Sequence, residues 1–199
     1  MQSYQFEEYG GGLTRHEVAT PRPSGDEVLL RVHACGVCHS DVHLWEGHFD
    51  LGGGRKADLK AGRSLPFTLG HEILGEVAEV GERVRGVAPG DRRLVYPWIG
   101  CGACAVCAAG DEHLCGRPRA LGVNLPGGYA DHVLVPDARY LFETGNLAPE
   151  LACTYACSGL TAYSALSKVK DAVRGRSLLV IGAGGVGMAG LAVARGLTE

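Results

Sequence analysis

Apolar and polar residues alternate in a way that predicts a series of short strands over the first part of the chain. Alternating and β-branched runs predict strands at Glu27–Val32, Glu72–Val80 and Arg92–Tyr96. Similar runs predict strands at Tyr129–Val135 and Tyr140–Phe142. Short strands separated by turn residues are typical of an all-β domain.

The segments between these strands favour loops and one short helix. Residues 39–46 predict a short helix, whereas 49–65 form a loop that contains Gly, Arg and Lys without a clear period. This loop is interpreted as a solvated surface insertion, with the alternative that Arg55 or Lys56 lies at a substrate entrance. Residues 97–127 are rich in Gly, Cys and Pro and predict an irregular excursion from the sheet.

The pattern becomes helical after the last of these strands. Apolar positions at helical spacing predict helices at Leu147–Cys153, Gly159–Val169 and Gly187–Leu197, and an all-apolar run predicts a strand at Ser177–Ile181. A strand that leads into a helix is typical of the first unit of an α/β fold. The expected domains are 1–146 and 147–199.

The composition indicates a globular protein with no nucleic-acid or membrane partner. Hydrophobic residues make up 46% of the 199 residues, and the net charge is −3 with Lys and Arg scattered along the chain. Met1–Phe6 lacks the pattern of a secretion signal, and no apolar stretch is as long as a membrane helix. Eight cysteines without such a signal indicate a reducing, cytoplasmic location. In that location, clustered cysteines are interpreted as metal ligands in preference to disulfides.

The strongest local motif is a run of four cysteines within the irregular excursion. Cys101, Cys104, Cys107 and Cys115 have the spacing C-x2-C-x2-C-x7-C, and four thiolates at this spacing can close a tetrahedron around one Zn²⁺. A full thiolate shell leaves no position for substrate, so this site is expected to be structural. The segment has little core of its own, and metal binding would supply its folding energy. An iron–sulfur cluster and disulfides are the alternatives.

Three other motifs surround dispersed Cys and His residues. They are Gly36-Val37-Cys38-His39-Ser40-Asp41 followed by Val42-His43, Gly70-His71-Glu72 with Gly75, and Cys157-Ser158-Gly159-Leu160-Thr161-Ala162-Tyr163. Together with the four-cysteine run, these motifs resemble the zinc-dependent medium-chain dehydrogenase family, whose best-known members are alcohol dehydrogenases. The resemblance covers essentially the whole chain, in the family's order.

The resemblance implies a second zinc site, with a catalytic role. Cys38, His71 and Cys157 correspond to the catalytic zinc ligands, and two thiolates with one imidazole leave a fourth position open. Asp41 corresponds to the carboxylate that orients the His71 ring. Glu72 is implied to lie close behind the metal and to serve as a transient extra ligand. Without the resemblance, a lone His71-Glu72 pair or a lone Cys157 is more often an ordinary core or surface feature.

The resemblance also implies a proton relay and contacts with a cofactor. Ser40 and His43 correspond to the relay that carries the alcohol proton to solvent, and His39 and Thr161 correspond to positions at the cofactor. The ordinary alternatives are that Ser40 caps a helix and that His43 is a solvated loop residue.

A glycine-rich fingerprint follows the last predicted strand. Gly182-Ala183-Gly184-Gly185-Val186-Gly187 has the pattern G-x-G-x-x-G before a predicted helix, which lets a dinucleotide pyrophosphate approach the backbone at a helix N-terminus. The residues expected to contact the cofactor are Gly182, Gly184, Gly185, Val186 and Gly187. The acidic residue that separates NAD from NADP is expected ~20 residues further along, beyond Glu199, so the cofactor is NAD or NADP.

The resemblance implies a mainly β GroES-like catalytic domain, followed by the first βα unit of a truncated Rossmann α/β domain, and the chain is expected to be a fragment. The implied activity is zinc-dependent oxidation of an alcohol to an aldehyde or ketone, with hydride transfer to NAD(P) and two zinc ions per chain. The substrate is a small-molecule alcohol or aldehyde, and full-length family members are expected to be homo-oligomers. The alternatives are a catalytically inactive, zinc-stabilised fragment and a medium-chain dehydrogenase acting on a polyol or an aromatic alcohol.

Overall fold

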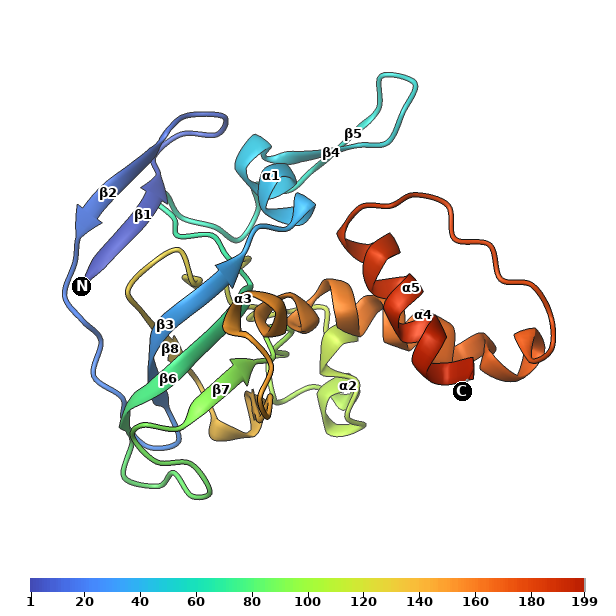
Figure 1. Cartoon of the computed structure of the whole chain (residues 1–199). Coiled ribbons are helices and arrows are strands. Elements are labelled where there is room, and N and C mark those ends of the chain that lie inside the picture. The colour runs from blue at the N-terminus through green and yellow to red at the C-terminus, as the bar shows by residue number, and fades with distance from the viewer. Residues whose placement is uncertain (199) are drawn as a thin grey trace.

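The centre of the molecule is a five-stranded antiparallel sheet, seen in a computed structural model that describes residues 1–198 (Figure 1). The strands lie in the order β8-β3-β6-β7-β9. Their bounds are β3 (Val28–Gly36), β6 (Glu72–Val80), β7 (Arg92–Val95), β8 (His132–Val135) and β9 (Leu141–Phe142). The nine-residue strands β3 and β6 pair through the middle of the sheet. All five strands predicted for this part of the chain are therefore confirmed, although β8 starts later than expected.

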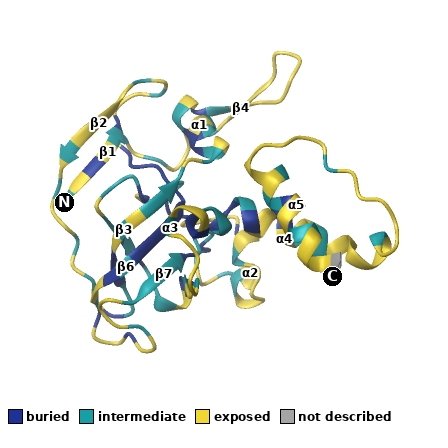
Figure 2. Ribbon diagram, in the orientation of Figure 1, coloured by how far each residue is buried: buried dark blue, intermediate teal, exposed yellow. Residues whose placement is uncertain are grey.

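The two faces of the central strands pack against different parts of the chain. Leu30 of β3 and Val77 of β6 belong to the main hydrophobic core and are almost completely buried. On the other face, Leu74 of β6 packs with Ala152 and Cys153 in a smaller core. Figure 2 shows this burial along β6. The segment that leads to Cys157 is therefore anchored directly on the sheet.

The predicted strand Tyr129–Val135 is shorter in the structure because its first residues bond to other segments. The Tyr129 carbonyl accepts the N–H of Tyr4 at 2.8 Å, and the Tyr129 N–H donates to the Leu69 carbonyl at 3.0 Å. The Asp131 N–H donates to Gln2 at 2.9 Å. These bonds connect β1 (Gln2–Phe6) to the sheet and fix the backbone of Tyr129 beside the segment that precedes His71.

Two hairpins lie outside the main sheet. The first pairs β1 with β2 (Leu13–Glu17). The second pairs β4 (His48–Asp50) with β5 (Lys56–Asp58) inside the segment that was expected to be an irregular loop, so this part of the prediction is wrong. Gly52, Gly53 and Gly54 all have φ between 60° and 77°, a region that favours glycine, and this turn allows the strands to pair. Arg55 and Lys56 lie exposed at this hairpin.

Helical elements occupy the rest of the described chain. Their bounds are α1 (His39–Glu46), α2 (Ala105–Ala108), α3 (Pro149–Ala152), α4 (Ser158–Val173) and α5 (Gly185–Thr198), with 3₁₀ turns at Glu112–Leu114, Ala138–Tyr140 and Cys153–Ala156. The predicted short helix at 39–46, the helices after residue 147 and the irregular excursion at 97–127 are confirmed, with small shifts of their ends. In residues 1–198, no helix is both long and apolar enough to cross a membrane.

The predicted strand at Ser177–Ile181 is wrong for this structure. The run is extended but unpaired, and its side chains are open to solvent, with Leu179 81% and Ile181 90% exposed. A strand requires a neighbour that exchanges backbone hydrogen bonds, and no strand of residues 1–198 lies beside this run. Helix α5 packs against α4 instead (Figure 1).

Candidate metal centres

The four cysteines of the irregular excursion converge on one point. Their sulfur atoms are 4.0, 3.5 and 3.8 Å apart in the pairs Cys101–Cys107, Cys104–Cys107 and Cys104–Cys115. A tetrahedron with Zn–S bonds of about 2.3 Å separates its sulfurs by about 3.8 Å, whereas a disulfide bond measures about 2.05 Å. All eight cysteines of the chain are free. The geometry fits one ion, and not disulfides or a cluster in which different irons bind different thiolates.

Backbone N–H groups contact two of the four sulfur atoms at this site. The N–H groups of Cys101 and Arg117 donate to the Cys115 sulfur at 3.4 and 3.3 Å. The backbone N–H of Ala103 lowers the pKa of Cys101 to about 6. The thiolate is the form that binds a metal, so Cys101 is prepared for one, whereas burial and the neighbouring Cys104 sulfur raise the pKa of Cys107 to about 11, and a metal ion there must displace a proton.

One carboxylate attaches the four-cysteine lobe (residues 100–117) to the sheet. Glu112 accepts the backbone N–H of Gly100 at 3.0 Å and the hydroxyl of Tyr140 at 2.7 Å. Its second oxygen lies 3.2 Å from the Arg139 guanidinium. A Cβ at Gly100 would lie 2.6 Å from the Cys107 sulfur, so the close approach of the two segments requires glycine there.

Replacing Glu112 with glutamine is expected to make stability less sensitive to acid. The Tyr140 hydroxyl holds the pKa of Glu112 below its ordinary range, against the opposing effect of burial. Such a carboxylate stabilises the fold above its ordinary pKa, and this contribution is lost as pH falls through the lowered value. The melting temperature should therefore fall less for E112Q than for the wild type as the pH is lowered from about 7 to about 3. The exposed Glu143→Gln variant is the control, and an equal decline in E112Q and the wild type would contradict this assignment.

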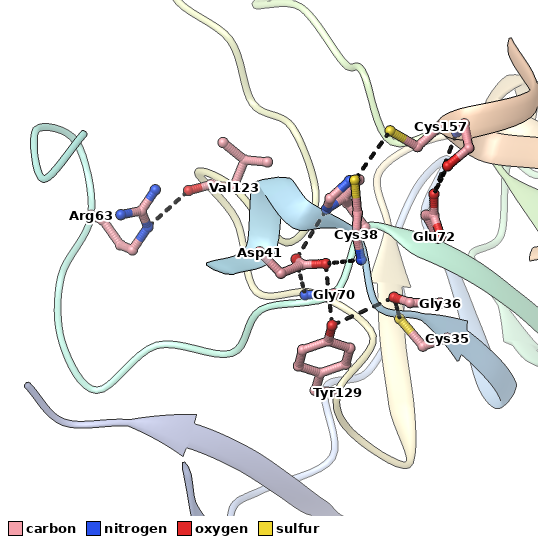
Figure 3. Close-up of polar contacts among 12 residues, drawn as sticks. Cys35, Gly36, Cys38, Asp41, Arg63, Gly70, Glu72, Val123, Tyr129 and Cys157 are labelled. Carbon is pink, nitrogen blue, oxygen red and sulfur yellow. Dashed lines mark hydrogen bonds and ion pairs between the residues drawn. The ribbon is translucent and has the colours of Figure 1, made fainter. Parts of the chain in front are cut away.

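The second set of predicted ligands comes together from three distant parts of the fold. Cys38 lies between β3 and α1, His71 immediately precedes β6, and Cys157 immediately precedes α4. One ligand atom from each lies within 4.8 Å of the others. The sulfurs of Cys38 and Cys157, 119 residues apart in sequence, are separated by 3.9 Å (Figure 3). This arrangement, the mixed-ligand site, matches the sulfur spacing around one tetrahedral zinc ion.

The His71 ring is prepared for a metal by its hydrogen bond. The ring is completely buried, and Nδ1 lies 3.1 Å from Oδ1 of Asp41. Since a carboxylate only accepts, Nδ1 carries a proton, and in the neutral ring Nε2 presents a lone pair. Nε2 is buried and has no hydrogen-bond partner in the described residues. Burial alone would lower the pKa of His71, but Asp41 and the nearby Cys38 sulfur raise it to about 9, so a metal ion at Nε2 competes with a proton.

Asp41 is the hub of hydrogen bonds beneath the mixed-ligand site (Figure 3). Besides the His71 ring, its carboxylate accepts the N–H of Gly70 at 3.1 Å, the N–H of Cys38 at 2.9 Å and the Tyr129 hydroxyl at 3.1 Å. The sequence singled out Asp41 through the resemblance, but nothing in the sequence indicated Tyr129, which comes from the segment before β8. One carboxylate thus fixes the positions of two ligands.

The two cysteines of the mixed-ligand site share a proton unequally. Hydrogen bonds with Cys157 and contact with His71 lower the pKa of Cys38. The Cys38 thiolate in turn raises the pKa of Cys157, and burial adds to this effect. A metal ion that binds both sulfurs releases the proton held by Cys157, so the affinity of this site should fall as the pH falls.

Glu72 and Trp98 border the mixed-ligand site. Glu72 is buried and accepts from the backbone N–H and the hydroxyl of Ser158 at 3.4 and 3.0 Å, and burial raises its pKa. The Trp98 ring centroid lies 5.3 Å from that of His71. Trp98 and Thr161 line a cavity of about 500 Å³, together with Tyr96, His113, Leu160, Ser164, Ala165 and Lys168. Sequence reasoning missed Trp98, because a single aromatic residue before the four-cysteine run carries no spacing signal.

The predicted relay residues share helix α1 but are not joined to each other. Ser40 is half-buried and follows the Cys38 ligand by two positions. The His43 ring lies 4.7 Å from that of His39 and 4.4 Å from that of Phe49 in β4. Within residues 1–198, no hydrogen bond connects Ser40 to His43. The stack of His39, His43 and Phe49 was not expected from the sequence.

The glycine fingerprint forms an exposed turn into α5. Gly182 has φ +97°, and a Cβ at Gly187 would collide with the Gly182 carbonyl. These are two of the roles that glycines have in a dinucleotide loop, namely the tight turn and close packing. Gly184 and Gly185 are exposed, and Val186 is 49% exposed. Helix α5 begins two residues earlier than predicted, and the N-terminus of this helix is accessible.

Comparisons with known proteins agree with this geometry. Residues 24–145 match the alcohol dehydrogenase GroES-like domain. The chain is 44% identical to the NAD-dependent alcohol dehydrogenase of Saccharolobus solfataricus, with 93% of this chain and 52% of that protein covered. It is 35% identical to the L-threonine 3-dehydrogenase of Coxiella burnetii, with 92% and 51% covered. A crystal structure of an NAD-dependent alcohol dehydrogenase superposes with a TM-score of 0.86 at 32% identity, covering 100% of this chain and 56% of that one.

The chain belongs to the zinc-type medium-chain alcohol dehydrogenase family through its GroES-like domain. It spans about half the length of the curated relatives it matches. The mainly β GroES-like fold expected from the sequence is confirmed.

Proposed function

We propose that this chain provides the metal-binding catalytic part of a zinc-dependent alcohol dehydrogenase that oxidises an alcohol to an aldehyde or ketone. The observation that carries the proposal is the meeting of Cys38, His71 and Cys157 around one point, with the Nε2 lone pair of His71 directed to no other partner in the described residues. Three protein ligands are typical of a catalytic zinc site, which keeps its fourth position open.

The chemistry is divided between the bound groups and the residues of the chain. Zinc at this site would act as a Lewis acid toward the alcohol, and a nicotinamide cofactor would accept the hydride. Asp41 orients the His71 ring through a 3.1 Å hydrogen bond. Ser40 accepts the alcohol proton and His43 passes it toward solvent, which requires a movement or a bridging water because no direct bond joins them in residues 1–198.

The cofactor would be held by the glycine fingerprint, with His39 at its pyrophosphate and Thr161 as a further contact. NAD is favoured because relatives at 39–44% identity are named NAD-dependent alcohol dehydrogenases, with NADP as the alternative. The end of the sheet at Phe142 supports the division into a metal-binding domain at 1–146 and a cofactor-binding segment at 147–199. The alcohol itself and assembly into homo-oligomers remain predictions.

Purified protein is expected to contain two zinc ions per chain, one for each cysteine-containing cluster. The four-cysteine site is closed and therefore structural, whereas the mixed-ligand site is open. Elemental analysis should find two zinc ions in the wild type and one in Cys38→Ser. Folded wild-type protein that contains no zinc, or iron alone, would contradict the proposal.

A second candidate is a zinc-stabilised β domain that does not turn over substrate by itself. The exposed fingerprint and the unpaired run before it favour this candidate. A calorimetric titration of the 199-residue chain with NADH distinguishes the dehydrogenase from the inert domain. Tight binding rules out the inert domain, and undetectable binding by the zinc-loaded chain favours it.

A further inference from the structure

The residues on both sides of Cys157 are held by side chains from other elements. The indole N–H of Trp98 donates to the carbonyl of Ala156 at 3.1 Å. The backbone N–H and the hydroxyl of Ser158 both donate to Oε1 of Glu72. Cys157 itself, with φ −128° and ψ −74°, lies outside the regular helix and strand regions and makes no side-chain cap. Its backbone bonds to Thr154 at 3.3 Å and to Thr161 at 2.9 Å join it to the adjoining turn and helix, and the contacts of Trp98 and Glu72 act on the residues immediately before and after it.

The contact with Glu72 also satisfies the start of α4. The first N–H groups of a helix have no partners within the helix, and a carboxylate near that end is favourable because of the helix dipole. Glu72, at the start of β6 and only 2% exposed, supplies this acceptor across the fold. Its other oxygen lies against Gly36, where an added Cβ would collide with it. The carboxylate is thus confined on both sides.

The Trp98 side has its own rigid support. Backbone bonds of 2.8 Å from Arg119 N–H to the Ile99 carbonyl and 3.1 Å from Leu121 N–H to the Pro97 carbonyl flank Trp98. Ile99 and Leu121 belong to the main core and are 3% and 1% exposed. The indole therefore projects from a fixed segment when it bonds to Ala156.

We propose that Trp98 and Glu72 are positioning residues for Cys157, with Glu72 acting through Ser158. Cys157 lies 119 residues after Cys38 in the sequence. Together, Trp98 and Glu72 hold its sulfur at the distance from the Cys38 sulfur that one metal ion needs. This inference rests on the proposed zinc site. It gives Glu72 a role different from that of a transient ligand, because the oxygen that accepts from Ser158 is engaged in holding the backbone.

Cadmium-113 NMR of the full chain tests this proposal, because one spectrum reports both sites separately. The four-thiolate site and the mixed-ligand site have different donor sets and should give two resonances. Titration with Cd²⁺ is compared in the wild type, Trp98→Phe and Ser158→Ala. Both variants are expected to weaken cadmium binding at the mixed-ligand site by about 10–100-fold, as for other residues that support metal ligands, with the four-thiolate resonance unchanged. Ser158→Thr, which keeps the hydroxyl, should restore the affinity.

The chain contains matched controls for both substitutions. Its only other tryptophan, Trp45, also donates its indole N–H to a backbone carbonyl, that of Gly11, away from Cys157. Ser3 is buried and shares a hydrogen bond of 2.7 Å with Thr68. Trp45→Phe and Ser3→Ala should lower thermal stability without changing either cadmium affinity.

The outcomes distinguish a failure of the proposed zinc site from a failure of the positioning roles alone. If the wild type shows only the four-thiolate resonance at saturating Cd²⁺, the mixed-ligand site and the positioning roles both fail. If the wild type shows two resonances but W98F and S158A bind like the wild type, only the positioning roles fail. If the control variants weaken the mixed-ligand site as much as W98F and S158A do, the effect is one of general stability and the positioning roles are overturned.

Discussion

Replacing Asp41 with alanine is expected to destabilise the fold by about 3–5 kcal/mol and to remove metal from the mixed-ligand site. The carboxylate is 3% exposed and accepts from four donors, namely Cys38 N–H, Gly70 N–H, the His71 ring and the Tyr129 hydroxyl. In D41A these buried donors lose their acceptor. His71 also loses the bond that keeps the proton on Nδ1.

The isosteric Asp41→Asn variant separates these two effects. Each oxygen of Asp41 accepts hydrogen bonds from two donors. In D41N the amide nitrogen replaces one of these oxygens, and it cannot accept a hydrogen bond from the two donors that it faces. If that nitrogen faces the His71 ring, Nδ1 becomes the acceptor and the proton moves to Nε2, which then cannot bind a metal. D41N should therefore lose at least 10-fold in metal affinity with a smaller loss of stability than D41A.

Urea unfolding and zinc content measure both effects. Asp50→Ala is the control, because Asp50 is exposed and accepts one backbone N–H in the β4–β5 turn. Surface changes of this kind are usually within about 0.5 kcal/mol. If D41A kept wild-type stability and both zinc ions, Asp41 would not be the hub that the hydrogen bonds describe.

Local features of this chain were predictable from the sequence because their physical causes are local. The four cysteines lie within one short run, so their spacing already indicates one ion. The strands of the sheet are apolar-rich and bounded by turn residues, so each could be located locally, although both faces of β3 and β6 are buried over part of their length. The β4–β5 hairpin was missed since its pairing depends on the conformation of three glycines, which the residue types alone do not fix.

Long-range features of the site were visible only through the resemblance or not at all. Cys38 and Cys157 meet across 119 residues, and no periodic pattern reports such a distance. Tyr129 and Trp98 reach the site from loops whose courses are determined by pairing with other segments. The run at Ser177–Ile181 shows the reverse case, in which an apolar pattern favours a strand but no neighbouring strand in residues 1–198 accepts it.

Replacing Cys104 with serine is expected to unfold the four-cysteine lobe while the sheet remains folded. Among residues 101–115 only Cys115 is buried, and Leu114 is 66% exposed, so the lobe has no hydrophobic core. Structural zinc contributes roughly 10–16 kcal/mol of apparent binding energy in isolated zinc-finger peptides, and a site with three thiolates would lose much of it. Hydrogen exchange should show lost protection in residues 100–117 and unchanged protection in β3.

The unfolding should stop at the edge of the lobe, because the segment on its sheet side is fixed independently. The bonds between residues 97–99 and 119–121 join the two ends of the lobe, and the core residues Ile99 and Leu121 hold this junction. Trp98 would therefore keep its bond to Ala156, and C104S should retain the zinc of the mixed-ligand site. Cys38→Ser is the reciprocal control, with the lobe protected and the mixed-ligand site empty. Loss of both zinc ions in C104S would show instead that the lobe supports Cys157 through Trp98, and that the two metal centres form one cooperative unit.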